Sequence, residues 1–254
     1  MVLAVERKAR IVEYVRKNRV ATISELAHEF SVHDATIRRD LSEIEQEGLL
    51  KRTHGGVTVE EWANDEASFN DRFNDQLDQK MRIGKRAAEL VKDGEHIIID
   101  SGTTTLHIAK NLVHRTNLTV VTNDMNVAAE LRDSPGIKVI LTGGELYPSS
   151  YMLNGMFTDR VLESLHVHKA FLGIPVLHPK LGLMHPEAQL VQTKIGMIEA
   201  AQQTIVVADA SKIGKVSLHS VAPNSSIHTL VTGEEASEFD IKQFREHGVE
   251  VITV

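Results

Sequence analysis

The stretch "ATIRRDL" (residues 35–41) places two adjacent arginines on an amphipathic segment. At 100° per residue, Ile37, Leu41 and Ile44 fall on one stripe, which needs a core to pack against. The opposite face is available to a partner, and it carries Ala35, Thr36, Arg39 and Ser42. Adjacent arginines on a helix are usually only a solvated face, so the meaning of this pair depends on the sequence around it.

Helical patterns precede this stretch. An apolar stripe over residues 5–15 predicts a first helix. Thr22 and Glu25 fit a capping box, which predicts the start of a second, short helix. Residues 31–33 are enough only for a tight turn before a third helix over 34–45. Two short helices joined by such a turn are typical of a helix-turn-helix.

The segment after the third helix predicts a hairpin. "LLKRTHGGVTV" (residues 49–59) alternates loosely around Gly55-Gly56, which is the pattern of a strand, a turn and a strand. A hairpin after a helix-turn-helix makes a winged helix. In that geometry the second helix of the motif lies in the major groove and the basic wing contacts the DNA backbone.

Composition and charge bound the remaining possibilities. The chain has 254 residues, a net charge of −7 and no cysteine, so a disulfide framework and a cysteine-rich zinc site are excluded. Residues 1–57 carry a net charge of +1 and residues 58–254 a net charge of −8, so only the first segment tolerates a polyanion. No signal peptide or membrane-spanning stretch is present in the sequence, and we expect a cytoplasmic protein with no membrane partner.

A polar, acidic connector follows the hairpin. We expect a linker over residues 58–78 and a helix near 78–92. Trp62, Phe69 and Phe73 are too apolar for a pure linker. They are expected to dock onto the larger domain, with an interface to a partner chain as the weaker alternative.

Strand-like and helical patterns alternate over residues 79–254. Near-continuous apolar strands separated by helices predict a parallel sheet covered on both faces. The expected strands are 96–100, 118–122, 137–142, 169–174, 204–209, 228–232 and 249–254. The expected helices include 104–113, 124–132, 187–202 and 235–247. Ligands of such sheets bind beyond the carboxyl ends of the strands.

Polar loops follow four of these strands. The loop over 100–105 has the sequence Asp-Ser-Gly-Thr-Thr-Thr and opens a helix, so its hydroxyls and free amides suit a phosphate, although a plain capped turn is an equal alternative. Residues 122–124, 142–144 and 209–214 supply the other loops, and Lys212 brings a cation to the same rim. Asn123 or Asp124 as a helix cap and Gly143-Gly144 as a turn are the structural alternatives.

The run over residues 32–57, "VHDATIRRDLSEIEQEGLLKRTHGGV", resembles the DNA-binding signature of the DeoR family of bacterial regulators of sugar metabolism. The likeness extends along the chain through "DSGTTT", "TN", "TGG", "AFLG" and the Asp-x-Ser-Lys-x-Gly run. It implies a winged helix-turn-helix followed by a Rossmann-like, mostly parallel α/β sensor domain related in fold to ribose-5-phosphate isomerase. The usual effectors of the family are phosphorylated sugars.

Two sets of contact residues are expected from the patterns and the resemblance together. The DNA-binding set is Thr22, His33, Ala35, Thr36, Arg38, Arg39, Ser42, Lys51, Arg52, His54 and Gly55. The effector-binding set is Asp100, Ser101, Gly102, Thr103, Thr104, Thr105, Asn123, Gly143, Gly144 and Lys212.

The chain departs from the family pattern at several places, and two of these departures bear most directly on the expected contacts. His33 stands where the family usually has a capping serine, so Asp34 or Ser31 takes that role or the helix begins less firmly. Ile174-Pro175-Val176 stands where the family tends to Val-Asp-Gly, so an acid expected near the pocket is missing. This absence counts against a sugar-phosphate isomerase, which needs a positioned base.

The hypothesis from the sequence is a transcriptional regulator, a repressor by preference, and not an enzyme. Residues 1–57 are expected to bind double-stranded operator DNA, 58–78 to link, and 79–254 to bind a phosphorylated sugar that alters DNA affinity. A homo-oligomer, dimer or tetramer, is expected to match repeated half-sites. The alternatives are an isomerase-like enzyme with an accessory N-terminal domain and a sugar-binding module without DNA contact. No cofactor is expected, and His166, His168, His178 and His185 lack the spacing of a known metal site.

Overall fold

The structure is a computed structural model that describes residues 4–18, 20–46, 49–53, 55–58, 61–63, 66–147 and 149–254. The chain divides into two compact units, Met1–Glu61 and Trp62–Val254. The boundary between the units falls within the expected linker.

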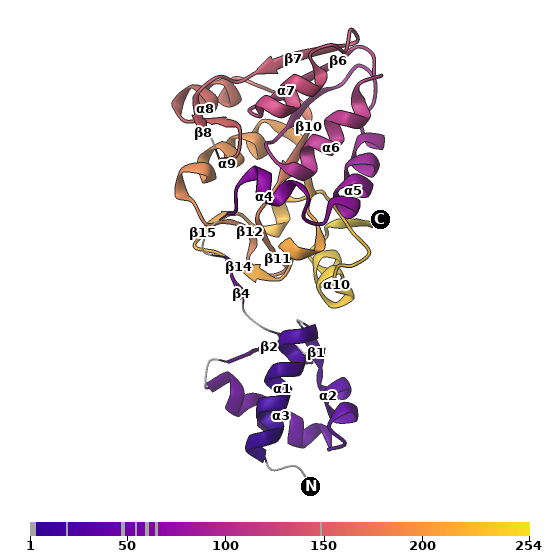
Figure 1. The fold of residues 1–254 in the computed structure, drawn as a ribbon, viewed down its shortest axis with the longest axis vertical. Coiled ribbons are helices and arrows are strands. Elements are labelled where there is room, and N and C mark those ends of the chain that lie inside the picture. Colours follow the sequence, from indigo (N-terminus) through magenta and orange to yellow (C-terminus); the bar gives the residue numbers. More distant parts are fainter. Residues whose placement is uncertain are drawn as a thin grey trace. The chain divides into compact units, whose positions relative to one another are not determined.

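The first unit contains the three expected helices and the hairpin (Figure 1). The helices are α1 (Ala4–Asn18), α2 (Ile23–Glu29) and α3 (Asp34–Gln46), and the strands are β1 (Val20–Thr22), β2 (Lys51–Thr53) and β3 (Gly56–Thr58). Ile37, Leu41 and Ile44 of α3 are fully buried in a core formed with α1 and α2. The apolar stripe that the sequence predicts is therefore the face of α3 that packs inward.

Local hydrogen bonds fix the ends of α2 and the position of the wing. The side chain of Thr22 accepts from the Glu25 amide at 3.1 Å, and the Glu25 carboxylate accepts from the Thr22 amide, so the predicted capping box is present. The sequence analysis did not predict β1, which pairs antiparallel with β3. A Cβ at Gly56 would lie 2.4 Å from the carbonyl oxygen of Ala21, so this close pairing requires glycine.

The connector enters the second unit through short elements. β4 (Glu61–Trp62) pairs with β14 (Lys215–Val216), and α4 (Phe69–Phe73) and α5 (Leu77–Glu89) follow. Phe69 is buried in the core of this unit, as expected, whereas the side chain of Trp62 lies outside the described residues.

Seven parallel strands form the main sheet of the second unit, and they correspond to the seven strands predicted from the sequence. Their order is β17-β16-β13-β10-β5-β6-β7. The bounds are β5 (His96–Ile99), β6 (Leu118–Thr122), β7 (Ile137–Leu141), β10 (Val167–Gly173), β13 (Ala201–Val207), β16 (Thr229–Thr232) and β17 (Glu250–Thr253). The first strand of this sheet along the sequence is β5, which lies in its interior. β6 and β7 follow on one side of β5, and β10, β13, β16 and β17 follow on the other, so the strand order reverses between β5 and β10.

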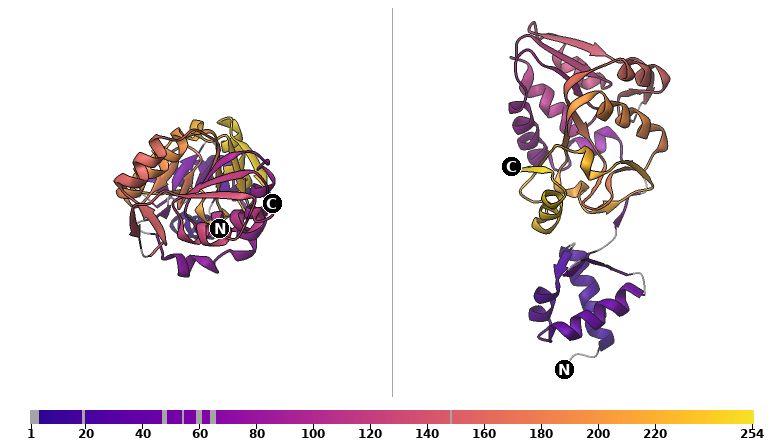
Figure 2. Two further views of the ribbon diagram at one scale, coloured as in Figure 1. Left: turned by 90° about the horizontal axis from the view of Figure 1, so that it is seen from above. Right: turned by 180° about the vertical axis from the view of Figure 1, so that it is seen from behind.

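Helices cover both faces of this sheet (Figure 1 and Figure 2). α5, α6 (Thr103–Leu112) and α7 (Met125–Leu131) share one core with Ile97 and Ile99 of β5. α8 (Met156–Glu163), α9 (Val191–Glu199) and α10 (Glu238–Glu246) share the other core with Ile98. Adjacent residues of β5 therefore contact opposite layers, as expected for a sheet buried on both faces.

Several short elements decorate the second layer and were not predicted. They are β8 (Glu145–Tyr147), β9 (Met152–Asn154), α8, β11 (Val176–His178), β12 (Gly182–His185), β14, β15 (His219–Ala222) and short 3-10 helices at Ala210–Lys212 and Asn224–Ser226. β11, β12 and β15 form an antiparallel sheet. Among the described residues, no helix has both the length and the apolar character needed to cross a membrane.

Candidate DNA-binding surface and effector pocket

The outer face of α3 presents cationic side chains to solvent. Arg38 is exposed, and the side chain of Arg39 is 84% exposed although it pairs with Glu43 at 3.4 Å. An exposed pair of this kind on one helix turn contributes little to stability. Both guanidinium groups therefore remain accessible to a partner.

Two ion pairs, one buried and one at the surface, hold α3 against α1. Asp40 is only 4% exposed and accepts from Arg7 through Nε at 2.6 Å and through Nη2 at 3.1 Å. Lys8 also reaches from α1 and donates to Glu43 at 3.1 Å. The hydrogen bond from Lys8, aided by the nearby Arg39, lowers the pKa of Glu43. These contacts fix how α3 is rotated, and so which side chains face outward.

The other residues that are expected to contact DNA also belong to the first unit, and they differ in their exposure to solvent. His33 and Ala35 are exposed, and Thr36, Ser42 and Arg52 are partly buried. His33 occupies the position just before α3, where its carbonyl oxygen accepts from the amides of Thr36 and Ile37. Thr22 serves as the cap of α2, and Gly55 forms the wing turn with a φ of +108°. His54 lies outside the described residues, as does the side chain of Lys51.

A pocket that is partly open to solvent lies in the second unit at the carboxyl ends of β5, β10 and β13, and both charged and apolar side chains line it. This is the point at which the strand order reverses, where sheets of this class bind ligands. Five of the expected effector contacts line the cavity: Ser101, Gly102, Thr103, Thr104 and Lys212.

One wall of the cavity is the N-terminus of α6. Its N-cap is Gly102, and no side chain caps this end of the helix. Asp124, which caps α7, holds the loop in place by accepting from the Ser101 hydroxyl at 2.7 Å and from the Gly102 amide at 3.3 Å. Burial raises the pKa of Asp124. The first amides of α6 thus face a cavity, which is the arrangement that favours an anion.

A buried ion pair between Asp100 and Lys194 lies where the cavity meets the carboxyl ends of β5 and β10. Asp100 accepts from Lys194 of α9 at 2.6 Å, and the same Lys194 ammonium donates to the carbonyl oxygen of Gly173 at 2.8 Å. Asp100 also accepts from the amides of Ser101 and Gly173. Its carboxylate therefore joins β5, β10 and α9 and does not itself line the cavity.

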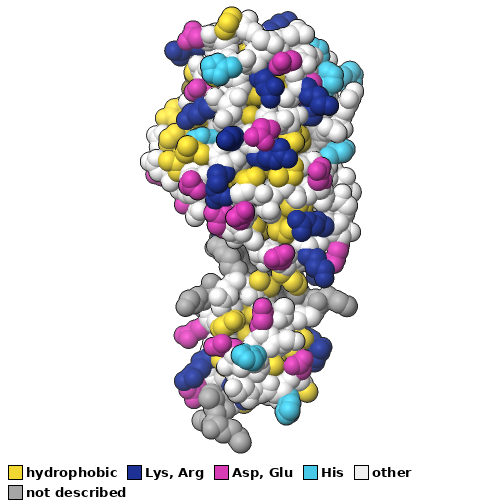
Figure 3. All heavy atoms as spheres, turned by 90° about the vertical axis from the view of Figure 1, so that its right-hand side faces the viewer, with side chains coloured by type: hydrophobic (Ala, Val, Ile, Leu, Met, Phe, Trp, Pro, Cys, Tyr) yellow, Lys and Arg dark blue, Asp and Glu magenta, His cyan; other side chains and the backbone are white. Residues whose placement is uncertain are grey.

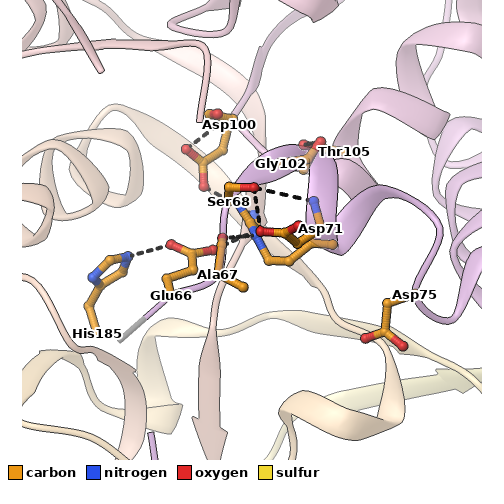
Figure 4. A network of polar contacts seen from close by, with 12 residues as sticks. Glu66, Ala67, Ser68, Asp71, Asp75, Asp100, Gly102, Thr105 and His185 are labelled. Carbon is orange, nitrogen blue, oxygen red and sulfur yellow. Dashed lines mark hydrogen bonds and ion pairs between the residues drawn. The ribbon is translucent and has the colours of Figure 1, made fainter. Parts of the chain in front are cut away.

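Glu66 and Arg72 of the connector form a second ion cluster with His185 of β12. Figure 4 shows Glu66 facing His185. Glu66 lies 2.6 Å from Arg72 and 3.5 Å from Nε2 of His185. Nδ1 of His185 accepts from the Glu187 amide, so the ring proton belongs on Nε2, facing Glu66. Burial opposes ionisation of Glu66, but the hydrogen bond from His185 and the charges of Arg72 and Lys194 together lower its pKa to about 2.

Lys212 and Asp209 form the opposite side of the cavity. Among the described residues, Lys212 has no ion-pair partner, unlike Arg72 and Lys194. Asp209 is 1% exposed, and its Oδ1 accepts from Ser211, but its Oδ2 has no hydrogen-bond partner in the described structure. A buried acceptor of this kind beside a cavity is suited to a donor on a ligand.

The remaining expected contacts lie away from the cavity. Thr105 is fully buried and donates to the carbonyl oxygen of Gly102. Asn123 donates to the carbonyl oxygen of Leu153. A Cβ at Gly144 would lie 2.5 Å from the carbonyl oxygen of Asn154 in β9 and 2.5 Å from Oγ1 of Thr158 in α8. Asn123 and the Gly143-Gly144 turn follow β6 and β7, which are one and two strands beyond β5. They support the β8–β9 hairpin and α8 instead of lining the cavity.

Several cavity residues were missed by sequence reasoning. Lys194 lies in a helix far along the chain, and Glu66 lies in a segment interpreted as linker, so no local pattern marks either one. Ile174 and Pro175 do line the cavity, and its acids are Glu66 and Asp209. No group of three or more His, Asp or Glu side chains suited to a metal is found within the described part of the chain.

Comparison with known proteins places these two units in a family. A model described as a DeoR-like helix-turn-helix domain matches residues 7–62, and one described as the DeoR C terminal sensor domain matches residues 75–234. The chain is 35% identical to an uncharacterized HTH-type transcriptional regulator of Bacillus subtilis (strain 168), YulB, over 99% of this chain and 97% of that protein.

The chain is also similar to a second relative and to a solved structure. The HTH-type transcriptional repressor GlcR of Bacillus subtilis (strain 168) is 31% identical over 97% of this chain and 95% of that protein. Ribose 5-phosphate isomerase A of Methanocaldococcus jannaschii is 20% identical with a TM-score of 0.41, covering 54% of this chain and 55% of that structure.

Proposed function

The chain belongs to the DeoR family, and on that premise we propose that it represses transcription and that a phosphorylated sugar in its second unit controls its affinity for DNA. It is a DNA-binding transcriptional regulator and not an enzyme, since full-length relatives are named as regulators and repressors with a helix-turn-helix domain. Repression is proposed by similarity to GlcR.

Support for DNA contact comes from the different environments of the two faces of α3. Its inner face is fully buried, while Arg38 and Arg39 point outward on a helix that the Arg7–Asp40 pair locks in rotation. Arginine at such a position suits guanine edges and phosphates. Lys51, Arg52 and His54 of the wing are proposed to contact the backbone.

The observation that carries the effector proposal is the pairing of an uncapped helix N-terminus with Lys212 on the walls of one cavity. Free amides and a lysine ammonium together suit a phosphate. We assign the phosphate of the effector to Ser101, Gly102, Thr103, Thr104 and Lys212.

The unpartnered Oδ2 of Asp209 supports the proposal that the effector contains a sugar. A hydroxyl of a bound sugar is a donor that would satisfy this buried acceptor, whereas an apolar ligand would leave it unsatisfied. The effector is therefore proposed to carry hydroxyl groups near its phosphate. A homo-oligomer is proposed because helix-turn-helix proteins bind repeated half-sites.

The test is a thermal-shift panel of sugar phosphates and the matching free sugars with the full chain. We expect at least one sugar phosphate to raise the melting temperature, its free sugar to have a much smaller effect, and Lys212→Ala to abolish the shift. Lys138→Ala, which removes an exposed lysine from β7, is the matched control and should respond as the wild type does. Equal stabilisation by free sugars, together with a silent Lys212→Ala, would refute the phosphate assignment.

A further inference from the structure

Glu66 is the one carboxylate that the connector inserts among the cations of the effector cavity, within the described residues (Figure 4). It precedes α4 and follows the segment that leaves the DNA-binding unit by only a few residues. The chain on both sides is hydrogen-bonded to the body of the second unit, through Ala63 to Val216 at 2.9 Å and through Phe69 to Ser149 at 2.7 Å. Glu66 therefore lines the cavity and belongs to the connector that leads to the DNA-binding unit.

Glu66 pairs with Arg72, whose planar guanidinium group matches the geometry of a phosphate better than the lysine ammonium groups of the cavity do. Arg72 bonds Glu66 at 2.6 Å, and its Nε donates to the Ala67 carbonyl oxygen at 2.8 Å. Lys194 is likewise held by Asp100. Guanidinium groups bind phosphate in a bidentate manner, so Arg72 would be a strong ligand if its carboxylate were removed.

The formal charges of the cavity point the same way. Arg72, Lys194 and Lys212 line the cavity, and they are balanced by Glu66 and Asp209, which also line it, and by Asp100, which pairs with Lys194 behind the wall. Since the pKa of Glu66 is lowered to about 2, its carboxylate is ionised at neutral pH. A phosphate dianion that enters meets repulsion from Glu66 as long as this carboxylate stays in place.

We propose that Glu66 acts as an internal anion that the phosphate-bearing effector displaces from Arg72, and that this displacement loosens the connector leading to the DNA-binding unit. The inference rests on the proposed function, because it assigns the regulation of the same cavity. It supplies a physical difference between two states: the effector prefers the state with Glu66 displaced, and only such a differential affinity can shift an equilibrium.

The decisive variant is Glu66→Gln, measured by titration calorimetry with inorganic phosphate and with glucose 6-phosphate as probes. Removing the competing charge should lower the Kd for phosphate on the order of tenfold, the effect of one charge-assisted hydrogen bond. Asp75→Asn makes the same charge change at an exposed site of the connector outside the cavity, and it should leave the Kd unchanged.

A double variant keeps the test independent of any loss of stability. Glu66→Gln with Arg72→Gln should bind phosphate no more tightly than the wild type, because the gain requires Arg72. Thermal unfolding of each variant checks that it is folded. Weaker binding by Glu66→Gln alone would mean that Glu66 is itself a ligand contact, and an unchanged Kd would mean that it does not compete; either result overturns the displacement.

Hydrogen exchange tests the consequence for the connector. Phosphate should speed exchange at the amides of Ala63 and Phe69 in the wild type, and Glu66→Gln should speed it without phosphate. Slower exchange on adding phosphate would contradict the proposal. If Lys212→Ala abolishes binding while Glu66→Gln also weakens it, the proposed function stands and displacement fails. If neither the wild type nor Glu66→Gln binds these probes or any sugar phosphate of the thermal-shift panel, both fail.

Discussion

Arg38 and Asp40 lie two residues apart on α3 and have opposite environments. Arg38 is exposed, whereas Asp40 is buried in the pair with Arg7. Asp40→Asn leaves the Arg7 guanidinium without its partner, and we expect a loss of about 2–4 kcal/mol in the unfolding free energy of the first unit. Arg38→Ala should change this free energy by less than about 0.5 kcal/mol. Denaturant unfolding of the full chain, followed by a probe in the first unit, measures both; equal effects would contradict the assigned roles.

His107 gives stability a pH dependence that one substitution should remove. It is 5% exposed on α6, its Nε2 has no partner within the described structure, and burial, with the charges of Lys110 and Lys80, lowers its pKa to about 4. In the unfolded chain histidine titrates near its ordinary pKa of about 6.5. Between these values the unfolded state binds the additional proton, so acidification favours unfolding.

We therefore expect the wild type to lose up to about 3 kcal/mol more stability than His107→Leu between pH 6.5 and pH 4. Urea melts at several pH values, compared between the two proteins, give this difference directly. Parallel pH profiles of the two proteins would show that His107 does not titrate in this way.

At the scale of single residues, the cavity residues that could be predicted are those that are adjacent in the sequence or directly follow a predicted strand. Ser101 to Thr104 are consecutive, and Lys212 follows a predicted strand, so their convergence at a sheet edge follows from topology. Glu66 and Lys194 reach the cavity through tertiary packing of the connector and of α9. No spacing along the chain encodes such a contact.

The contact between α5 and α6 depends on one missing methyl group. A Cβ at Gly84 would lie 2.4 Å from Cβ of His107 and 2.7 Å from its carbonyl carbon. Because the second atom is backbone, Gly84→Ala requires the helices to separate, and we expect a loss of about 1–3 kcal/mol. Gly196→Ala is the matched control: in α9 its new Cβ meets Leu162 at 3.4 Å, and helix propensity favours alanine.

Thermal unfolding of Gly84→Ala and Gly196→Ala checks this contact. The first should melt several degrees below the wild type, and the second at or slightly above it. If Gly84→Ala were as stable as the wild type, the close approach of α5 and α6 would not be required by the fold.

Element length decided what could be predicted at the next scale. The seven parallel strands carry runs of apolar residues that identify them, and the five inner strands of the sheet are largely buried, unlike the edge strands β7 and β17. The elements that escaped prediction, such as β1, β8, β9 and β14, are two or three residues long, and their pairing is set by tertiary contacts. α8 was missed as well, and the turn at Gly143-Gly144 packs against it.

At the scale of the whole molecule, charge is distributed unequally. The net charge of −7 belongs to the part of the chain after residue 57, which carries −8. On the face of the second unit shown in Figure 3, acidic and basic side chains are intermingled. DNA affinity should therefore come from local contacts of the first unit, and it should fall steeply with salt.

The most direct test of the account is fluorescence anisotropy of the full chain on a duplex selected by the wild-type protein from random DNA, with and without the sugar phosphate that stabilises it most. We expect Arg38→Ala to weaken DNA binding about tenfold or more. We also expect the sugar phosphate to lower the DNA affinity of the wild type but not of Lys212→Ala. DNA affinity that is indifferent to both Arg38→Ala and Arg39→Ala, or that responds to the sugar phosphate equally in Lys212→Ala, would contradict the account.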